Sequence, residues 1–174
     1  WIALLDDDDL WAPNKLVQQV TTAEQAGTGW VYAGAVEIDE AGSLLGGERP
    51  PPPELLVREF TRRNLMPAGS STVLVRKLCF ATTGLFDECL TAGADWDMWL
   101  RLTRQGSPAC VPDPLVAYRL HREQATLDTG GMIAEARILL TDKALRAQLA
   151  RAHEIDHHDV DRARFHHRRF GERR

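Results

Sequence analysis

Asp6-Asp7-Asp8-Asp9 follows directly on the apolar run Trp1-Ile2-Ala3-Leu4-Leu5. A short apolar run that ends in acids predicts a buried strand with carboxylates at its tip, where open α/β sheets bind their ligands. Four adjacent like charges repel one another, and a divalent cation such as Mg²⁺ or Mn²⁺ relieves that repulsion because it prefers oxygen ligands. A solvated acidic turn is the alternative. The position between a strand and a helix favours the cation, since Leu10-Trp11-Ala12-Pro13 opens a helix directly afterwards.

The composition predicts a soluble globular domain. The chain has 174 residues, of which 44% are hydrophobic and 26% are charged. Its net charge of −4 argues against a general basic surface for nucleic acid or an anionic membrane. No apolar run is long enough to span a membrane, and no signal-peptide pattern opens the chain. Cys79, Cys89 and Cys110 are an odd number without a CxxC pattern, so we expect reduced thiols in a cytoplasmic protein.

Strand and helix patterns alternate along the rest of the chain. Pro13 suits the first turn of a helix whose apolar face would carry Leu16, Val17, Val20 and Ala23. Strands are predicted at 30–38, 43–45, 70–75, 109–111 and 115–118, and helices at 54–63, 77–82, 95–105 and 132–150. The glycines and prolines of 46–53 predict a semi-rigid loop. The alternation predicts an α/β fold with a mostly parallel sheet flanked by helices.

A second informative stretch is Ala94-Asp95-Trp96-Asp97-Met98-Trp99-Leu100-Arg101-Leu102. Taken alone, it predicts a helix with ordinary structural features. Asp95 would be the N-cap, Asp97 would complement the helix dipole, and the two tryptophans would be core residues at helical spacing. Taken together with the acidic run, the same stretch favours a functional role for Asp95.

Several motifs follow one another in a fixed order. They are D-x-D-D after a strand, Leu-Trp before a Pro-led helix, Val-Leu-Val-Arg, Gly-Leu-Phe-Asp-Glu, the stretch from Ala94 to Leu102, and Tyr-Arg-Leu-His. This order resembles family 2 glycosyltransferases, inverting enzymes with the A-type (GT-A) nucleotide-sugar-binding fold. The resemblance covers residues 1–126, which would be the C-terminal part of a GT-A domain. Residues 127–174 would then be a helical C-terminal extension.

The resemblance also implies that part of the domain is missing. The first strands of this family carry the pocket for the nucleobase and the ribose, and no such segment precedes the D-x-D motif here. The chain starts at Trp1, inside a predicted strand. We therefore expect a fragment that lacks the N-terminal nucleotide-binding half and that is inactive, or nearly so, by itself.

The resemblance assigns roles to the acids. Asp6 and Asp8 correspond to the D-x-D pair, and Asp9 completes the D-x-D-D form. These acids would place the nucleotide sugar, and Asp8 would hold Mn²⁺ or Mg²⁺ on its diphosphate. Asp95 matches the aspartate of the family's Glu-Asp pair, which serves as the general base. Ala94 replaces the glutamate that often precedes it, so a supporting carboxylate is missing.

Tyr118-Arg119-Leu120-His121 is similar to the segment that closes over the site in this family. His121 is therefore a candidate metal ligand, with an ordinary surface histidine as the alternative. Arg119 would bind phosphate oxygens or, equally, form a structural ion pair. Gly69-Ser70-Ser71 would lie near the acceptor in this fold, although a plain strand entry is the favoured interpretation.

The implied reaction is a single displacement that inverts the anomeric centre. Asp95 would take the proton of an acceptor hydroxyl, and the cation would stabilise the departing nucleoside diphosphate. The expected partners are a nucleotide-sugar donor and a glycan or lipid-linked acceptor, as in polysaccharide, glycolipid or glycan synthesis, and no nucleic acid. Two alternatives stay open. A sugar nucleotidyltransferase would not need Asp95 as a base, and a non-catalytic carbohydrate- or nucleotide-binding module would bind without turnover.

The C-terminal tail is rich in histidine and arginine. His153 and His157 have the i, i+4 spacing that can hold a transition metal on one helical face. Six arginines lie around the later histidines: Arg162, Arg164, Arg168, Arg169, Arg173 and Arg174. A solvated helix is the favoured interpretation. A further hypothesis is that this basic end contacts acidic lipid or a partner, which would place the protein at the inner face of the membrane.

Overall fold

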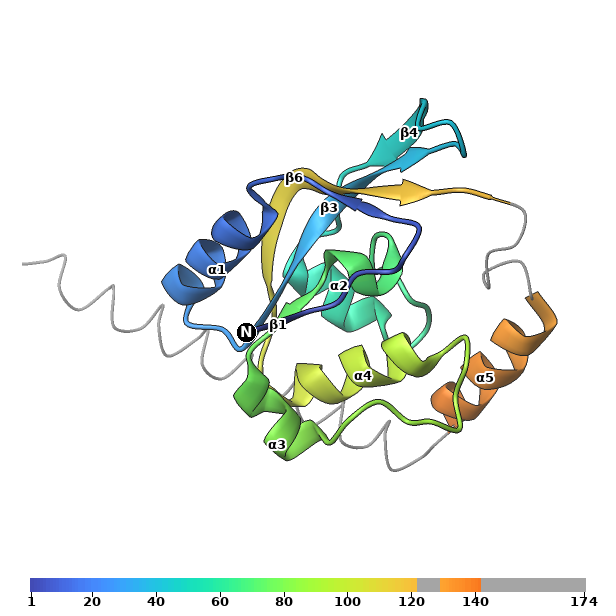
Figure 1. The fold of residues 1–174 in the computed structure, drawn as a ribbon. Helices are drawn as coiled ribbons and strands as arrows, with labels where there is room; N and C mark the ends of the chain where they lie inside the picture. The colour runs from blue at the N-terminus through green and yellow to red at the C-terminus, as the bar shows by residue number, and fades with distance from the viewer. Residues whose placement is uncertain (122–128, 142–174) are drawn as a thin grey trace, which may run out of the picture.

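The structure, a computed structural model, describes residues 1–121 and 129–141. It is an α/β domain in which one curled, mixed sheet has helices on both faces (Figure 1). The strands are β1 (Ile2–Ala3), β2 (Leu10–Trp11), β3 (Trp30–Ile38), β4 (Leu44–Glu48), β5 (Leu74–Val75) and β6 (Ala109–Arg119). The α-helices are α1 (Lys15–Ala26), α2 (Pro53–Glu59), α3 (Phe80–Thr83), α4 (Ala94–Leu102) and α5 (Thr129–Thr141). Short 3₁₀ helices are η1 (Gly69–Thr72), η2 (Lys77–Cys79) and η3 (Thr103–Gln105).

The prediction of a mostly parallel sheet is wrong. The strand order is β1-β5-β3-β6-β2, with β4 also paired to β3. Within the described residues, the only parallel pair is β3 with β6, and the pairs β1–β5, β2–β6, β3–β4 and β3–β5 are antiparallel. The alternation of strands and helices predicts parallel pairing only where a helix carries the chain back across the sheet. Here the two-residue strands β5 and β2 pair antiparallel with β3 and β6, and the two-residue strand β1 pairs antiparallel with β5.

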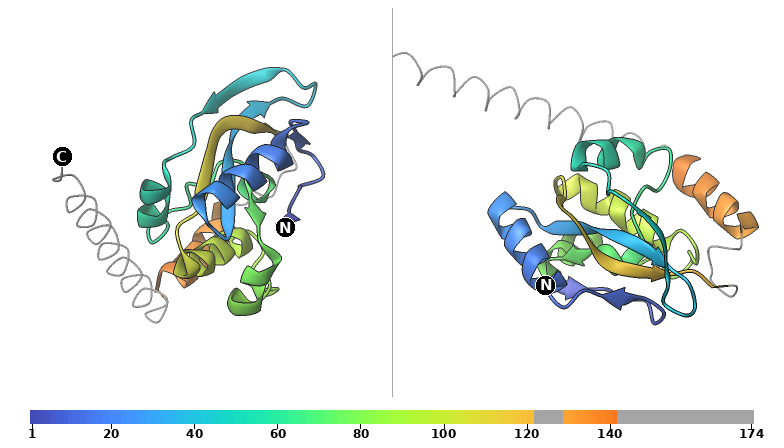
Figure 2. Two further views of the ribbon diagram at one scale, coloured as in Figure 1. Left: turned by 90° about the vertical axis from the view of Figure 1, so that its left-hand side faces the viewer. Right: turned by 90° about the horizontal axis from the view of Figure 1, so that it is seen from above.

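Alternation along β3 explains why both faces of the sheet are covered. Trp30 and Tyr32 point into one core with α2, α4 and Phe60, whereas Val31 and Ala33 point into a second core with Ala23 of α1. Successive side chains of a strand face opposite sides, so an unbroken apolar strand needs a partner on each face. The turned views in Figure 2 show α1 on one side of the sheet and α2 and α4 on the other.

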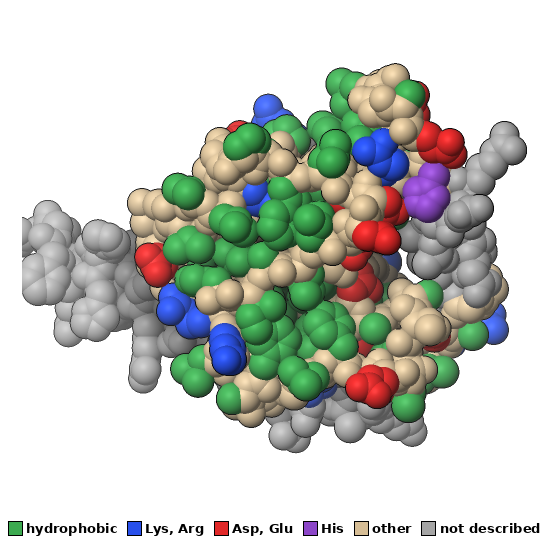
Figure 3. Space-filling model, viewed as in Figure 1, with side chains coloured by type: hydrophobic (Ala, Val, Ile, Leu, Met, Phe, Trp, Pro, Cys, Tyr) green, Lys and Arg blue, Asp and Glu red, His purple; other side chains and the backbone are tan. Residues whose placement is uncertain are grey.

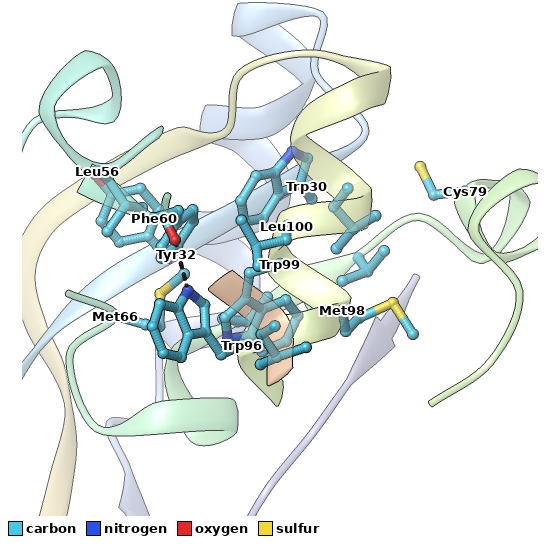
Figure 4. Packing of buried hydrophobic residues seen from close by; sticks show 14 residues of the cluster. Trp30, Tyr32, Leu56, Phe60, Met66, Cys79, Trp96, Met98, Trp99 and Leu100 are labelled. Carbon is cyan, nitrogen blue, oxygen red and sulfur yellow. Dashed lines mark hydrogen bonds between the residues drawn. The ribbon is translucent and has the colours of Figure 1, made fainter. Parts of the chain in front are cut away.

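The larger core is built around tryptophan (Figure 4). Trp30 and Trp99 stack with ring centroids 6.3 Å apart, and Phe86 meets Trp99 edge-on. The buried indole of Trp96 donates a 3.0 Å hydrogen bond to the carbonyl of Phe60. The prediction that Trp96 and Trp99 are core residues is confirmed. This packing fixes α4 against the sheet, and α4 carries Asp95 in its first turn.

Helix α1 buries only part of the predicted face, namely Ala23 and, in part, Val20. Lys15, Gln19 and Ala23 are buried, whereas Leu16 and Val17 remain 45% and 71% exposed. The polar pair is satisfied internally, because Lys15 Nζ donates to Gln19 Oε1 at 2.7 Å and Gln19 Nε2 donates to the Thr72 carbonyl at 2.7 Å. A hydrophobic pattern cannot anticipate a buried polar pair whose partner lies 53 residues away.

Four local predictions also need correction. Residues 10–13 do not open a helix, because Leu10–Trp11 is strand β2 and α1 begins at Lys15. Residues 70–73 form η1 and an extended turn, so only Leu74–Val75 is strand. Gly46 and Gly47 belong to β4 rather than to the proline-rich loop. Residues 109–119 form one strand, β6, because Pro112-Asp113-Pro114 makes a bulge and does not interrupt pairing. Gly34 of β3 accommodates that bulge, since a Cβ there would lie 3.0 Å from the carbonyl oxygens of Pro112 and Asp113.

Helix α5 packs on the domain through Leu139, which is buried in the tryptophan core beside Ala136. The predicted helix over 132–150 is thus present as far as Thr141. The predicted helical tail, including His153, His157 and the arginines after them, lies outside the described residues. No helix within 1–121 or 129–141 combines the length and the hydropathy needed to cross a bilayer.

Candidate active site

The acidic run forms a tight turn between β1 and β2. The amide of Asp9 donates to the carbonyl of Asp6 at 3.2 Å, which closes the turn. The amide of Asp6 donates to Ser71 Oγ at 3.1 Å, which ties the turn to η1. Burial, and then the neighbouring acids Asp9, Asp8 and Asp7, raise the pKa of Asp6. The repulsion expected from the sequence therefore persists in the fold.

Asp9 has a different environment from the other acids of the run. It is 5% exposed and is absent from the cleft that the others line. Its Oδ1 accepts the backbone N–H of Arg119 at 3.1 Å, so it joins the acidic turn to the end of β6. Burial raises the pKa of Asp9, although hydrogen bonds from Ser71 and Arg119 oppose that shift. These contacts are those of a structural residue beneath the turn.

Arg119 holds the acidic turn from the β6 side. Its Nε donates to the Asp8 carbonyl at 2.9 Å, and its Nη1 donates to the carbonyls of Asp39 and Glu40 at 3.0 Å each. The guanidinium thus fastens the acidic turn to the β3–β4 turn. Arg119 is absent from the cleft lining, and these bonds use donors that a phosphate would need.

His121 reaches Asp8 immediately after β6. The distance from His121 Nε2 to Asp8 Oδ2 is 2.7 Å, although 113 residues separate the two in the chain. Both side chains line the cleft. The structure therefore brings together the two residues that the sequence assigned to a metal.

Asp95 lies at the start of α4. It is the second residue of the helix rather than its N-cap, which is Gly93. Its Oδ1 accepts the amide of Trp96 at 2.6 Å, and the Asn64 side chain also hydrogen-bonds the carboxylate. Burial, with a further contribution from the charge of Asp6, raises the pKa of Asp95. A raised pKa makes a carboxylate more basic, which suits it for accepting a proton.

One cleft of about 920 Å³ is lined by the first three acids of the turn together with Asp95 and His121. Its polar lining includes Asp6, Asp8, Asn64, Asp95 and His121, and its apolar lining includes Leu5, Met66, Phe86 and Ala92. In Figure 3 the carboxylates gather in a band beside a hollow, next to the histidine. Gly69 and Ser70 also line the cleft, beside Asp95, where a Cβ on Gly69 would lie 3.6 Å from Asp95 Oδ2.

Two sets of contacts that support this site were not predicted from the sequence. Asn64 follows α2 in a stretch without any motif, and its Oδ1 accepts the amide of Met66 at 3.0 Å. That bond orients its amide nitrogen toward Asp95. Ser71 was interpreted as a plain strand entry, yet its hydroxyl accepts the Asp6 amide and its carbonyl accepts the Trp11 indole N–H at 3.0 Å. No local pattern signals either contact, because each depends on packing between distant segments.

The side chains of the described residues do not form an independent metal site. Among the described residues, no group of three or more His, Cys, Asp and Glu side chains is placed to hold an ion. Asp8 Oδ2 and His121 Nε2, at 2.7 Å, are close to the spacing of about 2.9 Å between adjacent ligands of an octahedral ion with bonds of about 2.05 Å. Mg²⁺ commonly binds one or two protein groups and takes its remaining ligands from water and substrate phosphates.

Comparison with known proteins reveals distant relatives. The chain is 29% identical over 133 residues to an uncharacterized glycosyltransferase of Rickettsia typhi, covering 72% of this chain and 41% of that protein. It is 26% identical over 147 residues to an uncharacterized glycosyltransferase of Rickettsia felis, covering 80% of this chain and 24% of that protein. These relatives are glycosyltransferases by name. The chain spans less than half of their length, and no family model matches it.

Proposed function

We propose that this chain is the metal- and acceptor-binding part of an inverting glycosyltransferase of family 2 type with a GT-A fold. The observation that carries the proposal is the single cleft that holds the acidic turn, His121 and Asp95. The distant similarity to glycosyltransferases supports the general class of reaction. In this proposal the acidic turn binds the diphosphate, and the partly buried Asp95 carboxylate on α4 has a separate role.

Asp6, Asp8 and His121 would bind the diphosphate end of a nucleotide sugar. Asp8 and His121 would hold Mn²⁺ or Mg²⁺, which supplies positive charge for the departing diphosphate. Asp9 and Arg119 would act beneath this site, because their contacts fix the turn and do not face the cleft. This assignment differs from the sequence interpretation for Asp9, which was expected to help place the nucleotide sugar. For Arg119 the sequence interpretation left phosphate binding and a structural role equally open.

Asp95 would act as the general base. An acceptor hydroxyl attacks the anomeric carbon, the bond from that carbon to the diphosphate oxygen breaks, and the nucleoside diphosphate leaves with the electron pair. The hydroxyl proton passes to Asp95, whose pKa is already raised by burial. Asn64 and the Trp96 amide hold the carboxylate in one orientation for this transfer.

Donor binding can be tested by thermal stability of the full-length protein. UDP, GDP, CDP and dTDP would each be added with and without Mn²⁺, to the native protein and to Asp8→Asn. A ligand at about 100 times its Kd stabilises by about 2.7 kcal/mol, which raises the Tm of a domain of this size by roughly 5–10 °C. We expect one diphosphate to reach that shift only with Mn²⁺, and Asp8→Asn to abolish it.

Asp7→Asn is the matched control for that experiment. Asp7 belongs to the same turn and lines the same cleft, but the contact with His121 is made by Asp8. We expect Asp7→Asn to retain most of the metal-dependent shift. Equal loss in both variants would indicate that only the total negative charge matters. Absence of any nucleotide-dependent shift in the native protein would contradict the proposed donor site.

A further inference from the structure

Helix α4 begins without a capping side chain of its own. Its N-cap is Gly93, which has no side chain to accept the exposed amides of the first turn, and Ala94 follows it. The segment ahead of Gly93 has no regular secondary structure, yet Thr91 and Ala92 line the cleft. The orientation of Asp95, two residues after Gly93, therefore depends on whatever holds this segment.

Glu135 of α5 binds the segment just ahead of the helix. Its Oε2 accepts the Gly93 amide at 2.6 Å, and its Oε1 accepts the Thr91 amide at 3.0 Å and the Thr91 hydroxyl at 2.7 Å. Hydrogen bonds from Thr91 are the main reason that the pKa of Glu135 lies below its usual value. A carboxylate from a remote helix thus accepts the backbone amide of the N-cap residue itself, and its negative charge suits the positive end of the helix dipole.

The close approach of α5 to Gly93 is a second, independent observation. A Cβ at position 93 would lie 3.2 Å from Glu135 Oε2 and 3.3 Å from Leu139 Cδ1. Leu139 is itself buried in the tryptophan core, so α5 is anchored where it meets this segment. The lack of a side chain at Gly93 allows α5 to dock directly against the amino end of α4.

We propose that Glu135 is a positioning residue for Asp95, and that α5 is part of the active-site framework. The inference rests on the proposed role of Asp95 as general base. Glu135 does not line the cleft. It acts by holding residues 91–93, and through them the first turn of α4, in the geometry that directs the Asp95 carboxylate into the cleft.

The test compares three variants in the full-length protein. Glu135→Ala removes all of these bonds. Glu135→Gln can keep the bonds to both backbone amides, because its side-chain oxygen in the place of Oε2 can accept from Gly93 and Thr91, while its NH₂ donates to the Thr91 hydroxyl. Arg137→Ala is the control on the same helix, since Arg137 is exposed. Turnover would be followed as nucleoside diphosphate release from UDP-, GDP- and dTDP-sugars with water as acceptor, and donor binding as the Mn²⁺-dependent thermal shift.

We expect Glu135→Ala to lower kcat at least tenfold while the diphosphate affinity changes less than twofold, because the acidic turn lies on another element. Glu135→Gln should restore at least half of native kcat, and Arg137→Ala should match the native protein. Hydrogen exchange of the 87–95 segment should rise in Glu135→Ala only. A kcat within twofold of native in Glu135→Ala, or equal loss in Glu135→Gln, would overturn the inference. No turnover in the native protein would overturn the proposed function as well.

Discussion

Replacing Asp95 by Asn separates the chemistry of this residue from its structural role. Asparagine has the same shape, and its side-chain oxygen can still accept the bond from the Trp96 amide or from Asn64. What disappears is the ability to take a proton. A positioned general base contributes about 10²–10⁴ in rate, which corresponds to about 3–5 kcal/mol of transition-state stabilisation. We therefore expect Asp95→Asn to lower kcat by about 10²–10⁴.

The same substitution should increase stability. Because the pKa of Asp95 is raised in the fold, the native state binds more protons than the unfolded state between the ordinary value of 3.8 and the raised value. Stability is therefore lost as the pH rises through the folded pKa. Above the raised pKa the native protein carries this cost in full and Asp95→Asn does not, so the variant should have the higher Tm there. The difference should disappear below pH 3.8, where the carboxyl is protonated in both states.

Asp97→Asn is the matched control, because Asp97 lies on the same helix turn and does not line the cleft. Its carboxylate pairs with Arg101 at 2.5 Å. We expect the opposite pattern in Asp97→Asn, with a lower Tm and a kcat within twofold of native. The assay is release of nucleoside diphosphate from sugars of the nucleotide that the thermal-shift panel identifies. An Asp95→Asn enzyme that keeps more than a tenth of native kcat, or that melts below the native protein, would refute the reasoning.

Three further predictions concern residues that support the site. Lys15 is fully buried, and burial lowers its pKa from 10.5 to about 8. Because the unfolded state binds more protons between these values, the unfolding free energy measured in urea titrations should rise by about 3 kcal/mol between pH 8 and pH 10.5. The Lys15→Met variant should lack this rise. Gly34→Ala should cost about 1–3 kcal/mol of unfolding free energy, because its Cβ would press on the carbonyls of the β6 bulge; an unchanged urea midpoint would disprove this crowding. Arg119→Lys keeps the positive charge but loses the planar guanidinium that reaches three backbone carbonyls. The affinity for the diphosphate, measured by isothermal titration, should therefore fall several-fold. Native affinity in this variant would show that the acidic turn does not need Arg119.

Local sequence was sufficient for features that depend on neighbouring residues. The strand from Trp30 to Ile38 follows from its apolar and β-branched composition, and the helix that carries Asp95 follows from the spacing of its tryptophans. The acidic turn also follows from the sequence, because four consecutive acids cannot continue a buried apolar strand. These features persist because strand and helix periodicities decide which side chains can be buried together.

Tertiary structure alone decided the sheet pairing and the environment of each site residue. Strand direction depends on which segments meet across the sheet, and two-residue strands such as β1 and β5 carry too little pattern to specify it. The contacts of His121 with Asp8, and of Glu135 with Thr91 and Gly93, each join segments more than 40 residues apart. Such contacts leave no periodic trace in the sequence, because they require only one complementary atom at each end. The sequence therefore indicated which acids to consider. Only the fold decided that Asp8 and Asp95 line one cleft. It also decided that Asp9 and Arg119 hold the acidic turn without lining that cleft.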